Sequence, residues 1–250
     1  MSAARAELAP LAAALDAAPA PVAFWWRDDD AGRPDPRLVR LLALAGELTL
    51  PLAVAVVPAW LEDEVRQAIL ACPQATVLQH GWAHESHAEP GERKVELGGS
   101  AVPAALAPLL DEGRRYLESS FGRCFVPVMV PPWNRMAPAV CAVLPGCGFT
   151  GVSLWRGTGI APSPAGLRRI DTHIDLIDWR RGRTARPAGA LAAELAEQVR
   201  GGPGGPLGIL SHHLVMDESA FSVLRALLRL LRAHPRARLL GAGELFSEPP

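Results

Sequence analysis

Three of the seven histidines in this chain lie within eight positions of one another, in the segment VLQHGWAHESH at residues 77–87. Apolar residues lead directly into this segment, which indicates that the histidines lie where a buried strand reaches the surface. His80 and His84 are four residues apart, so on a helical turn their rings would project from one face and converge on one ion. His87, three residues beyond His84, could join them. Surface or capping histidines would show the same spacing.

A second polar cluster, RDDDAG at residues 27–32, follows another apolar run. The adjacent carboxylates of Asp28, Asp29 and Asp30 repel one another unless a cation or an arginine lies among them. A solvated acidic turn before a helix would also explain them. One carboxylate with two histidines is, however, a suitable ligand set for Zn²⁺ or a similar divalent ion, and three protein ligands with an open fourth position are typical of a catalytic site. Such an ion lowers the pKa of bound water towards about 7.

The elements that must position these residues alternate between strands and helices. We expect strands at residues 21–26, 50–57, 75–79, 125–130, 149–155, 168–177 and 206–211, and helices at residues 35–47, 59–72, 104–121, 189–201 and 219–234. This order predicts an α/β fold in which six or seven units close a parallel sheet into a barrel, with the active site at the carboxyl ends of the strands. The polar segments 27–32, 79–87, 130–135, 171–180 and 209–218 all follow predicted strands.

Composition limits the classes of function. The chain has 250 residues, of which 49% are hydrophobic, and it has a formal net charge of −1. We expect one domain, with no basic surface of the kind that nucleic acid requires. No apolar run approaches the roughly 20 residues of a membrane span, and we interpret the Ala-rich residues 1–20 as a short amphipathic helix rather than a targeting segment. The four cysteines form no CxxC motif, which favours free thiols and a cytoplasmic protein.

The polar segments resemble the motifs of the polysaccharide deacetylases with a NodB homology domain, also called carbohydrate esterase family 4. RDDDA looks like the family's TFDDG, HGWAH like its H[ST]xxH-like motif, VPPWN like its RPPYG-like motif, DLIDW like its Asp before Trp, and LSH like its Leu-x-His. The five segments follow one another in the family's order within residues 27–213. The resemblance implies a NodB-like, distorted (β/α)7-type barrel that forms a single domain over residues 1–250, with residues 1–20 as a helical extension.

Carried over residue by residue, the resemblance implies that Asp30, His80 and His84 bind one divalent ion and that Asp29 is the general base. The triple aspartate leaves a second register open, in which Asp28 is the base and Asp29 the ligand. The expected ion is Zn²⁺, with Co²⁺, Mn²⁺ or Ni²⁺ as alternatives.

The later motifs supply further candidates. His212 matches the general acid, with His213 as an alternative and as a substrate contact, and Asp178 before Trp179 matches the fourth motif. Trp82, Pro132, Trp133 and Trp179 lie in or beside the motifs, and the tryptophans could stack on sugar rings, although ordinary packing would explain each of them equally well.

The implied reaction removes an acetyl group from an N-acetylated, or less typically an O-acetylated, sugar or polysaccharide precursor. Water activated by the ion and by Asp29 attacks the acetyl carbonyl, and His212 protonates the departing amine, because an unprotonated amide nitrogen is a poor leaving group. Two alternatives remain open: a sugar-binding and metal-binding relic of the same fold, and another metal-dependent amide hydrolase.

One departure from the family pattern bears on activity. Val130 stands where the family usually has the arginine that orients the base. Arg27 and Arg135 are the candidate substitutes. In an extended strand Arg27 and Asp29 point to the same face, which favours Arg27.

Overall fold

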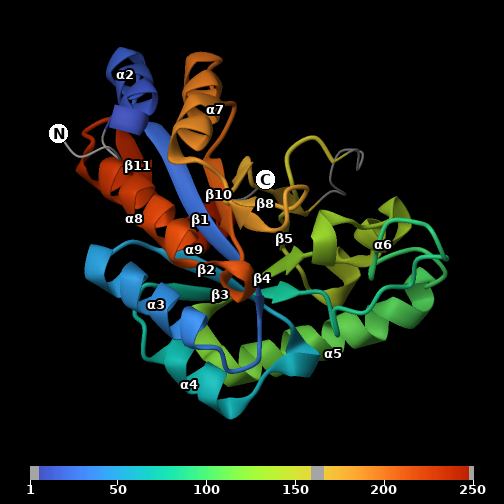
Figure 1. Cartoon of the computed structure of the whole chain (residues 1–250). Coiled ribbons are helices and arrows are strands. Elements are labelled where there is room, and N and C mark those ends of the chain that lie inside the picture. The colour runs from blue at the N-terminus through green and yellow to red at the C-terminus, as the bar shows by residue number, and fades with distance from the viewer. Residues whose placement is uncertain (1–5, 159–165, 248–250) are drawn as a thin grey trace.

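A curled parallel sheet forms the centre of the molecule in the computed structural model, which describes residues 6–158 and 166–247 (Figure 1). Its strands are β1 (Val22–Ala31), β2 (Leu52–Val56), β3 (Ala75–His80), β4 (Phe125–Val130), β5 (Gly151–Val152), β6 (Arg168–Arg169), β7 (Ile174–Asp175) and β10 (Leu207–Ser211), joined in the order β6-β5-β4-β3-β2-β1-β10-β7. β11 (Ala237–Leu239) pairs with the start of β1. A separate antiparallel pair joins β8 (Ile177–Asp178) to β9 (Thr184–Ala185).

The two outermost strands in this order, β6 and β7, belong to one continuous stretch of chain, residues 168–175. On one side this stretch pairs with β5, and Thr172 continues the pairing through a bridge to Trp155. On the other side it pairs with β10, where Ile174 lies opposite Ile209. The curled sheet therefore comes round to meet itself, and the predicted distorted (β/α)7-type barrel is confirmed.

Helices lie around the sheet. In Figure 1, α2, α7 and α8 are in the upper part of the view, and α3, α4 and α5 are in the lower part. Their bounds are α2 (Ala9–Ala17), α3 (Pro36–Leu48), α4 (Asp63–Leu70), α5 (Pro103–Phe121), α6 (Pro138–Val143), α7 (Ala188–Arg200), α8 (Glu218–Ala233) and α9 (Ala242–Ser247), with single turns η1 (Pro58–Trp60), η2 (Gly122–Cys124), η3 (Pro132–Asn134), η4 (Pro145–Cys147) and η5 (His213–Val215). Asp35 accepts a hydrogen bond from the Arg37 amide at 2.8 Å and so caps the N-terminus of α3.

Strand alternation on β1 separates two chemical environments. Phe24 and Trp26 pack in the large apolar cluster that includes α3, α7 and α8. Trp25 faces the opposite way and packs against Phe246 of α9, with ring centroids 6.2 Å apart. Since side chains alternate along a strand, Arg27 and Asp29 follow Trp25 into the interior of the curled sheet, and Asp28 follows Trp26.

Some expected elements differ from those observed. The expected strand 149–155 pairs as a strand only at Gly151–Val152, and the expected strand 168–177 is divided among β6, β7 and β8. The N-terminal extension forms helix α2, whereas residues 1–5 lie outside the described part of the chain. Across the described ranges, no helix is both long and apolar enough for a membrane crossing.

Candidate active site

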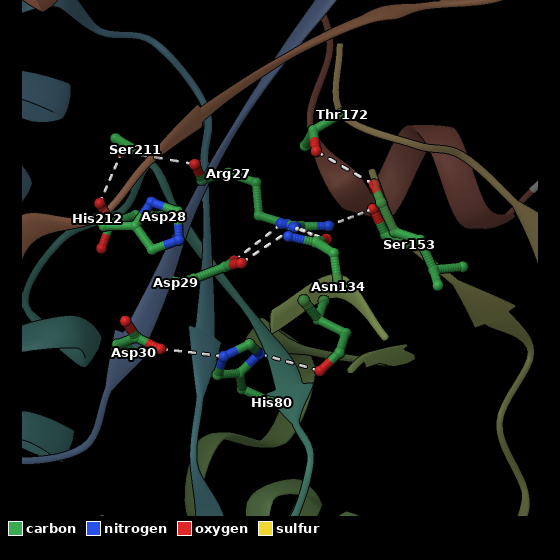
Figure 2. Close-up of polar contacts among 12 residues, drawn as sticks. Arg27, Asp28, Asp29, Asp30, His80, Asn134, Ser153, Thr172, Ser211 and His212 are labelled. Atoms are coloured by element: carbon green, nitrogen blue, oxygen red, sulfur yellow. Dashed lines mark hydrogen bonds and ion pairs between the residues drawn. The ribbon is translucent and has the colours of Figure 1, made fainter. Parts of the chain in front are cut away.

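The three aspartates at the end of β1 point in three different directions (Figure 2). Asp28 and Asp29 lie on opposite faces of the strand, and both are buried. Asp30 has a φ of 73°, in the left-handed region that aspartate tolerates better than most residues, and this turn takes its side chain out of the strand alternation. Three neighbouring carboxylates therefore enter three different environments.

Asp30 lies with His80 and His84 in a cluster of potential metal ligands. The Nε2 atoms of both histidines are 3.1 Å from Oδ1 of Asp30, and the three ligand atoms lie within 4.8 Å of one another. Within residues 6–158 and 166–247, this is the one group of three such side chains close enough to share an ion. The cluster matches the ligand set that the sequence predicts.

The hydrogen bonding of His80 fits a bound cation. Its Nδ1 lies 2.9 Å from the carbonyl oxygen of Val130, which can only accept a hydrogen bond, so Nδ1 carries a proton. A neutral His80 then directs the lone pair of Nε2 at the Asp30 carboxylate, and two lone pairs at this distance repel unless a proton or a cation lies between them. A divalent ion satisfies both, and a carbonyl partner for the distal nitrogen is typical of metal-binding histidines.

The electrostatics of this cluster favour charge on both partners. Burial alone would raise the pKa of Asp30, but hydrogen bonds from His80 and His84 outweigh it and hold that pKa well below its usual range. Burial opposes protonation of His80, yet the Asp30 carboxylate raises the pKa of the imidazole. The site therefore attracts positive charge, which a proton or a metal ion can supply.

The path between the two histidines is a loop, not the helical turn that their spacing suggested. His80 ends β3, Gly81 has a φ of 60° and His84 a φ of 58°. The amides of Trp82, Ala83 and His84 all point at Oε1 of Glu96. Convergence of the two rings thus depends on loop geometry rather than on helical periodicity.

His87 does not join this cluster. Its Nδ1 donates a hydrogen bond to the carbonyl oxygen of Glu96 at 2.6 Å, and its ring is not among the three grouped ligands. His87 instead fastens the connection between β3 and α5.

Arg27 lies beside Asp29, as its position on β1 predicts (Figure 2). Nε of Arg27 is 2.8 Å from Oδ1 of Asp29, and Nη2 is 3.0 Å from Oδ2. The same guanidinium donates to the hydroxyl of Ser153 at 2.6 Å and to the carboxamide oxygen of Asn134 at 2.8 Å. Arg135, the other candidate, donates to the backbone carbonyl of Lys94. Arg27 is thus the cation that holds Asp29.

Asp28 belongs to a buried network on the other face of β1. Its Oδ2 accepts hydrogen bonds from the Ser211 hydroxyl at 2.6 Å and from the His213 amide at 3.1 Å, and its Oδ1 contacts Nδ1 of His213. Burial, the largest effect, raises the pKa of Asp28 in spite of these donors. His213 is 0% exposed, so the expected substrate contact is corrected to a buried contact with Asp28.

His212 takes up a different position, at the carboxyl end of β10. Its Nδ1 is 3.6 Å from Oδ1 of Asp175, and its ring meets Trp179 edge to face with centroids 4.8 Å apart. The indole of Trp179 donates to Oδ2 of the same Asp175 at 2.7 Å. Burial would lower the pKa of His212, but the charges of Asp175, Asp29 and Asp30 raise it to about 9. The imidazole is therefore protonated at neutral pH.

Asp178, which the resemblance selects in the fourth motif, is the last residue of β8. Its carboxylate accepts from the amides of Arg180 and Arg181 at 3.0 and 3.1 Å. The carboxylate beside His212 belongs instead to Asp175, three residues earlier. No local sequence pattern indicates that Asp175 pairs with His212, because the two residues are far apart in the sequence.

Aromatic side chains flank the metal-ligand cluster. The ring of His84 lies between Trp133 and Trp60, with centroid distances of 4.4 and 5.2 Å. Trp82 packs against the apolar cluster beneath α5 and α6, and Pro132 is buried against Gly81. Trp179 is 45% exposed. Trp133 and Trp179 thus each contact a histidine of the site.

Several residues of this site were not predicted from the sequence: Trp60, Glu96, Asn134, Ser153, Asp175 and Ser211. Asn134 follows the predicted strand at residues 125–130 and Ser153 lies within the predicted strand at residues 149–155, so their contacts with Arg27 could have been sought there. Glu96 lies in a connection without periodicity, so no local pattern indicates it.

The chain resembles solved structures in fold. It is 18% identical to a candidate polysaccharide deacetylase from Mycobacterium smegmatis (TM-score 0.65, covering 90% of this chain and 88% of that one). It is 15% identical to a family 4 acetyl xylan esterase from Clostridium thermocellum in complex with a cobalt ion (0.57, 90% and 90%) and 14% identical to a family 4 pseudoenzyme from Bacillus anthracis (0.60, 92% and 67%). No family model and no curated protein matches the chain. The fold is therefore that of the carbohydrate esterase family 4 structures.

Proposed function

We propose that this protein is a metal-dependent deacetylase of the carbohydrate esterase family 4 type, which removes the acetyl group of an N-acetylated or O-acetylated sugar. Three lines support the proposal: the five ordered motifs, the fold shared with family 4 structures, and the arrangement of charged groups around the Asp30, His80 and His84 cluster. The last of these carries the most weight, because the paired carboxylate of Asp29 and the imidazole of His212 both lie near the three potential ligands.

Asp30, His80 and His84 would hold the ion in this proposal. A divalent ion there would supply polarisation of the acetyl carbonyl and activation of water. Two nitrogens and one carboxylate oxygen suit Zn²⁺, which we propose as the ion, and also Co²⁺. The similar acetyl xylan esterase was solved in complex with a cobalt ion, and this supports the proposal of a divalent ion here.

Asp29 is the proposed general base. The two-point pair with Arg27 fixes the plane and position of its carboxylate. Ser153 and Asn134 hold the guanidinium from its other edges, so Arg27 cannot turn away from Asp29 without losing those contacts. Asp28 is proposed to be structural, since Ser211 and His213 surround its carboxylate.

His212 is the proposed general acid. The pKa of about 9 keeps a proton on the ring at neutral pH, ready for the departing nitrogen or oxygen. Asp175 supplies the nearest negative charge and orients Nδ1, which leaves Nε2 for the leaving group. Hydrolysis of an amide requires a base and an acid on separate groups, and Asp29 and His212 are the proposed pair.

The site also offers surfaces for a sugar. Trp133 contacts His84 and Trp179 contacts His212, and we propose that both tryptophans pack against the sugar ring, with Trp82 and Pro132 shaping the loop between the histidines. A cytoplasmic substrate, such as a soluble precursor, is part of the same proposal.

The relic of the same fold is the second candidate, because a pseudoenzyme is among the similar structures and Val130 replaces the expected arginine. The contact between Arg27 and Asp29 opposes it, since the function of the missing cation is supplied from β1.

Release of acetate from a panel of acetylated mono- and oligosaccharides tests the proposal. We expect release that depends on added Zn²⁺ or Co²⁺, stops with chelator, and is absent in Asp29→Asn. Metal binding by wild type without release from any sugar or other acetylated amide would favour the relic. Turnover confined to non-carbohydrate amides would favour a different amide hydrolase.

A further inference from the structure

Glu96 is a buried carboxylate outside the predicted ligand set. It is 2% exposed, and it lies in the connection between β3 and α5, at least twelve residues beyond the loop that it contacts. Its Oε1 accepts hydrogen bonds from three successive amides: Trp82 at 3.1 Å, Ala83 at 2.7 Å and His84 at 3.2 Å. Three consecutive N–H groups directed at one point form a concave anion site of the kind that successive amides make in tight turns.

The loop needs this anchor because its backbone is unfavourable by itself. His84 has a φ of 58°, in the left-handed region that is unfavourable for a residue with a Cβ. This turn brings Nε2 of His84 to 3.1 Å from Asp30. The three hydrogen bonds that the carboxylate accepts from the amides compensate for the strain and select this conformation of the loop.

Glu96 also occupies the space beside the start of the loop. A Cβ built on Gly81 would lie 1.9 Å from Oε2 of Glu96 and 2.7 Å from Cγ of Pro132. Any side chain at position 81 would therefore displace the carboxylate. The carboxylate of Glu96 therefore fits against the loop only because position 81 is a glycine.

Glu96 is itself held from behind. Its carbonyl oxygen accepts from His87, and the neighbouring Leu97, fully buried, forms a bridge to Met136 and accepts from the Ala137 amide at 2.7 Å. The segment after β4 thus fixes the carboxylate, and the carboxylate fixes the loop. His80 does not depend on this device, because β3 and the Val130 carbonyl hold it.

We propose that Glu96 is a positioning residue for the metal centre, which acts through the backbone of residues 82–84 to hold His84 as a ligand. The inference rests on the proposed metal site but concerns a residue that takes no part in binding or chemistry directly. Loss of the carboxylate releases His84 and leaves Asp30 and His80 in place. Metal affinity then falls towards that of a site with two ligands.

A double-mutant cycle on Zn²⁺ affinity, measured by competition with a chelating dye, tests the proposal. We expect Glu96→Ala to weaken binding about 10-fold to 100-fold, the usual effect of removing a group that orients a ligand, and Glu96→Gln to weaken it less. In a protein that already carries His84→Ala, Glu96→Ala should not lower the Zn²⁺ affinity further, because Glu96 is proposed to act through His84. Glu92→Ala, which removes an exposed carboxylate from the same connection, is the matched control and should bind as wild type does.

The outcomes separate this inference from the proposed function. Two results would overturn the role of Glu96 and leave the proposed metal site intact. One is wild-type Zn²⁺ affinity in both Glu96 variants. The other is an equally large loss of Zn²⁺ affinity when Glu96→Ala is added to His84→Ala. If Glu96→Ala does not fold, Glu96→Gln decides by the same cycle. If wild type itself binds no Zn²⁺, the proposed function fails, and amide hydrogen exchange of Trp82, Ala83 and His84 decides the role of Glu96: faster exchange in Glu96→Gln than in Glu92→Ala supports it, and equal exchange overturns it.

Discussion

The guanidinium of Arg27 and the carboxylate of Asp29, two residues apart on β1, meet edge to edge at 2.8 and 3.0 Å. Both side chains are almost completely shielded from solvent, since their exposed fractions are 0% and 2%. A buried pair of this kind is not needed for stability, because apolar residues often replace such pairs without loss. Its presence at the end of a strand beside a ligand cluster is better explained by the chemistry of Asp29.

The first prediction concerns Arg27→Lys. Lysine keeps the positive charge but cannot make the two-point contact or hold Ser153 and Asn134 together, so we expect turnover to fall about tenfold or more while the metal stays bound. Arg27→Ala leaves Asp29 buried without a partner and should cost about 3–5 kcal/mol of unfolding free energy. Steady-state kinetics, metal analysis and urea unfolding measure the three effects. Equal turnover of wild type and Arg27→Lys would show that the pair is not used in catalysis.

The second prediction separates the two aspartate registers. Asp30→Asn should lose the ion, because its carboxylate is the proposed oxygen ligand, whereas Asp29→Asn should keep the ion and lose turnover. Elemental analysis after incubation with Zn²⁺ and gel filtration gives the metal content of each variant. The reverse result would assign Asp29 as the ligand and make Asp28 the base.

The third prediction uses Asp28. Asp28→Asn removes one charged acceptor from Ser211 and His213 in a fully buried network, and we expect it to lower the unfolding free energy by about 1–3 kcal/mol. Metal affinity should stay within a few-fold of wild type. Urea unfolding compares this variant with Asp63→Asn, the same change at the exposed start of α4. Loss of turnover with unchanged stability would instead indicate a catalytic Asp28.

The fourth prediction concerns the pH dependence of turnover. His212 acts as an acid only while it is protonated, so activity should persist up to its pKa of about 9 and decline as the pH rises through that value. Asp175→Asn removes the nearest charge that raises this pKa, and the decline should then begin at lower pH. Asp178→Asn removes the same charge three residues away, without contact to His212, and should leave the decline in place. A shift in Asp178→Asn but not in Asp175→Asn would reverse the assignment.

The features that the sequence could predict lie in regular helices and strands. The capped helix start at Asp35 and the alternation of Trp25, Arg27 and Asp29 follow from local rules, and both are confirmed. The ligand cluster follows from residue types at strand ends. These features depend on periodicities of two and 3.6 residues, which are visible in a single sequence.

Features that depend on irregular backbone were not predictable in this way. The left-handed residues His84 and Asp30 have no sequence signature as strong as glycine, so a helical turn was expected between the histidines. The pairing of Asp175 with His212 and the anchoring of the loop by Glu96 connect distant segments through loops. Such contacts appear only once the chain is folded.

The carbonyl oxygen of Val130 accepts from both Nδ1 of His80 and the Gly81 amide, at 2.9 and 3.2 Å. Every amino acid supplies the same carbonyl, so the support that position 130 gives to the histidine is independent of its side chain. Mutation there can exchange arginine for valine without disturbing the ligand, provided that another strand supplies the cation. A classification of such proteins as active or inactive by the residue at this one position would therefore misjudge chains in which another strand supplies the arginine.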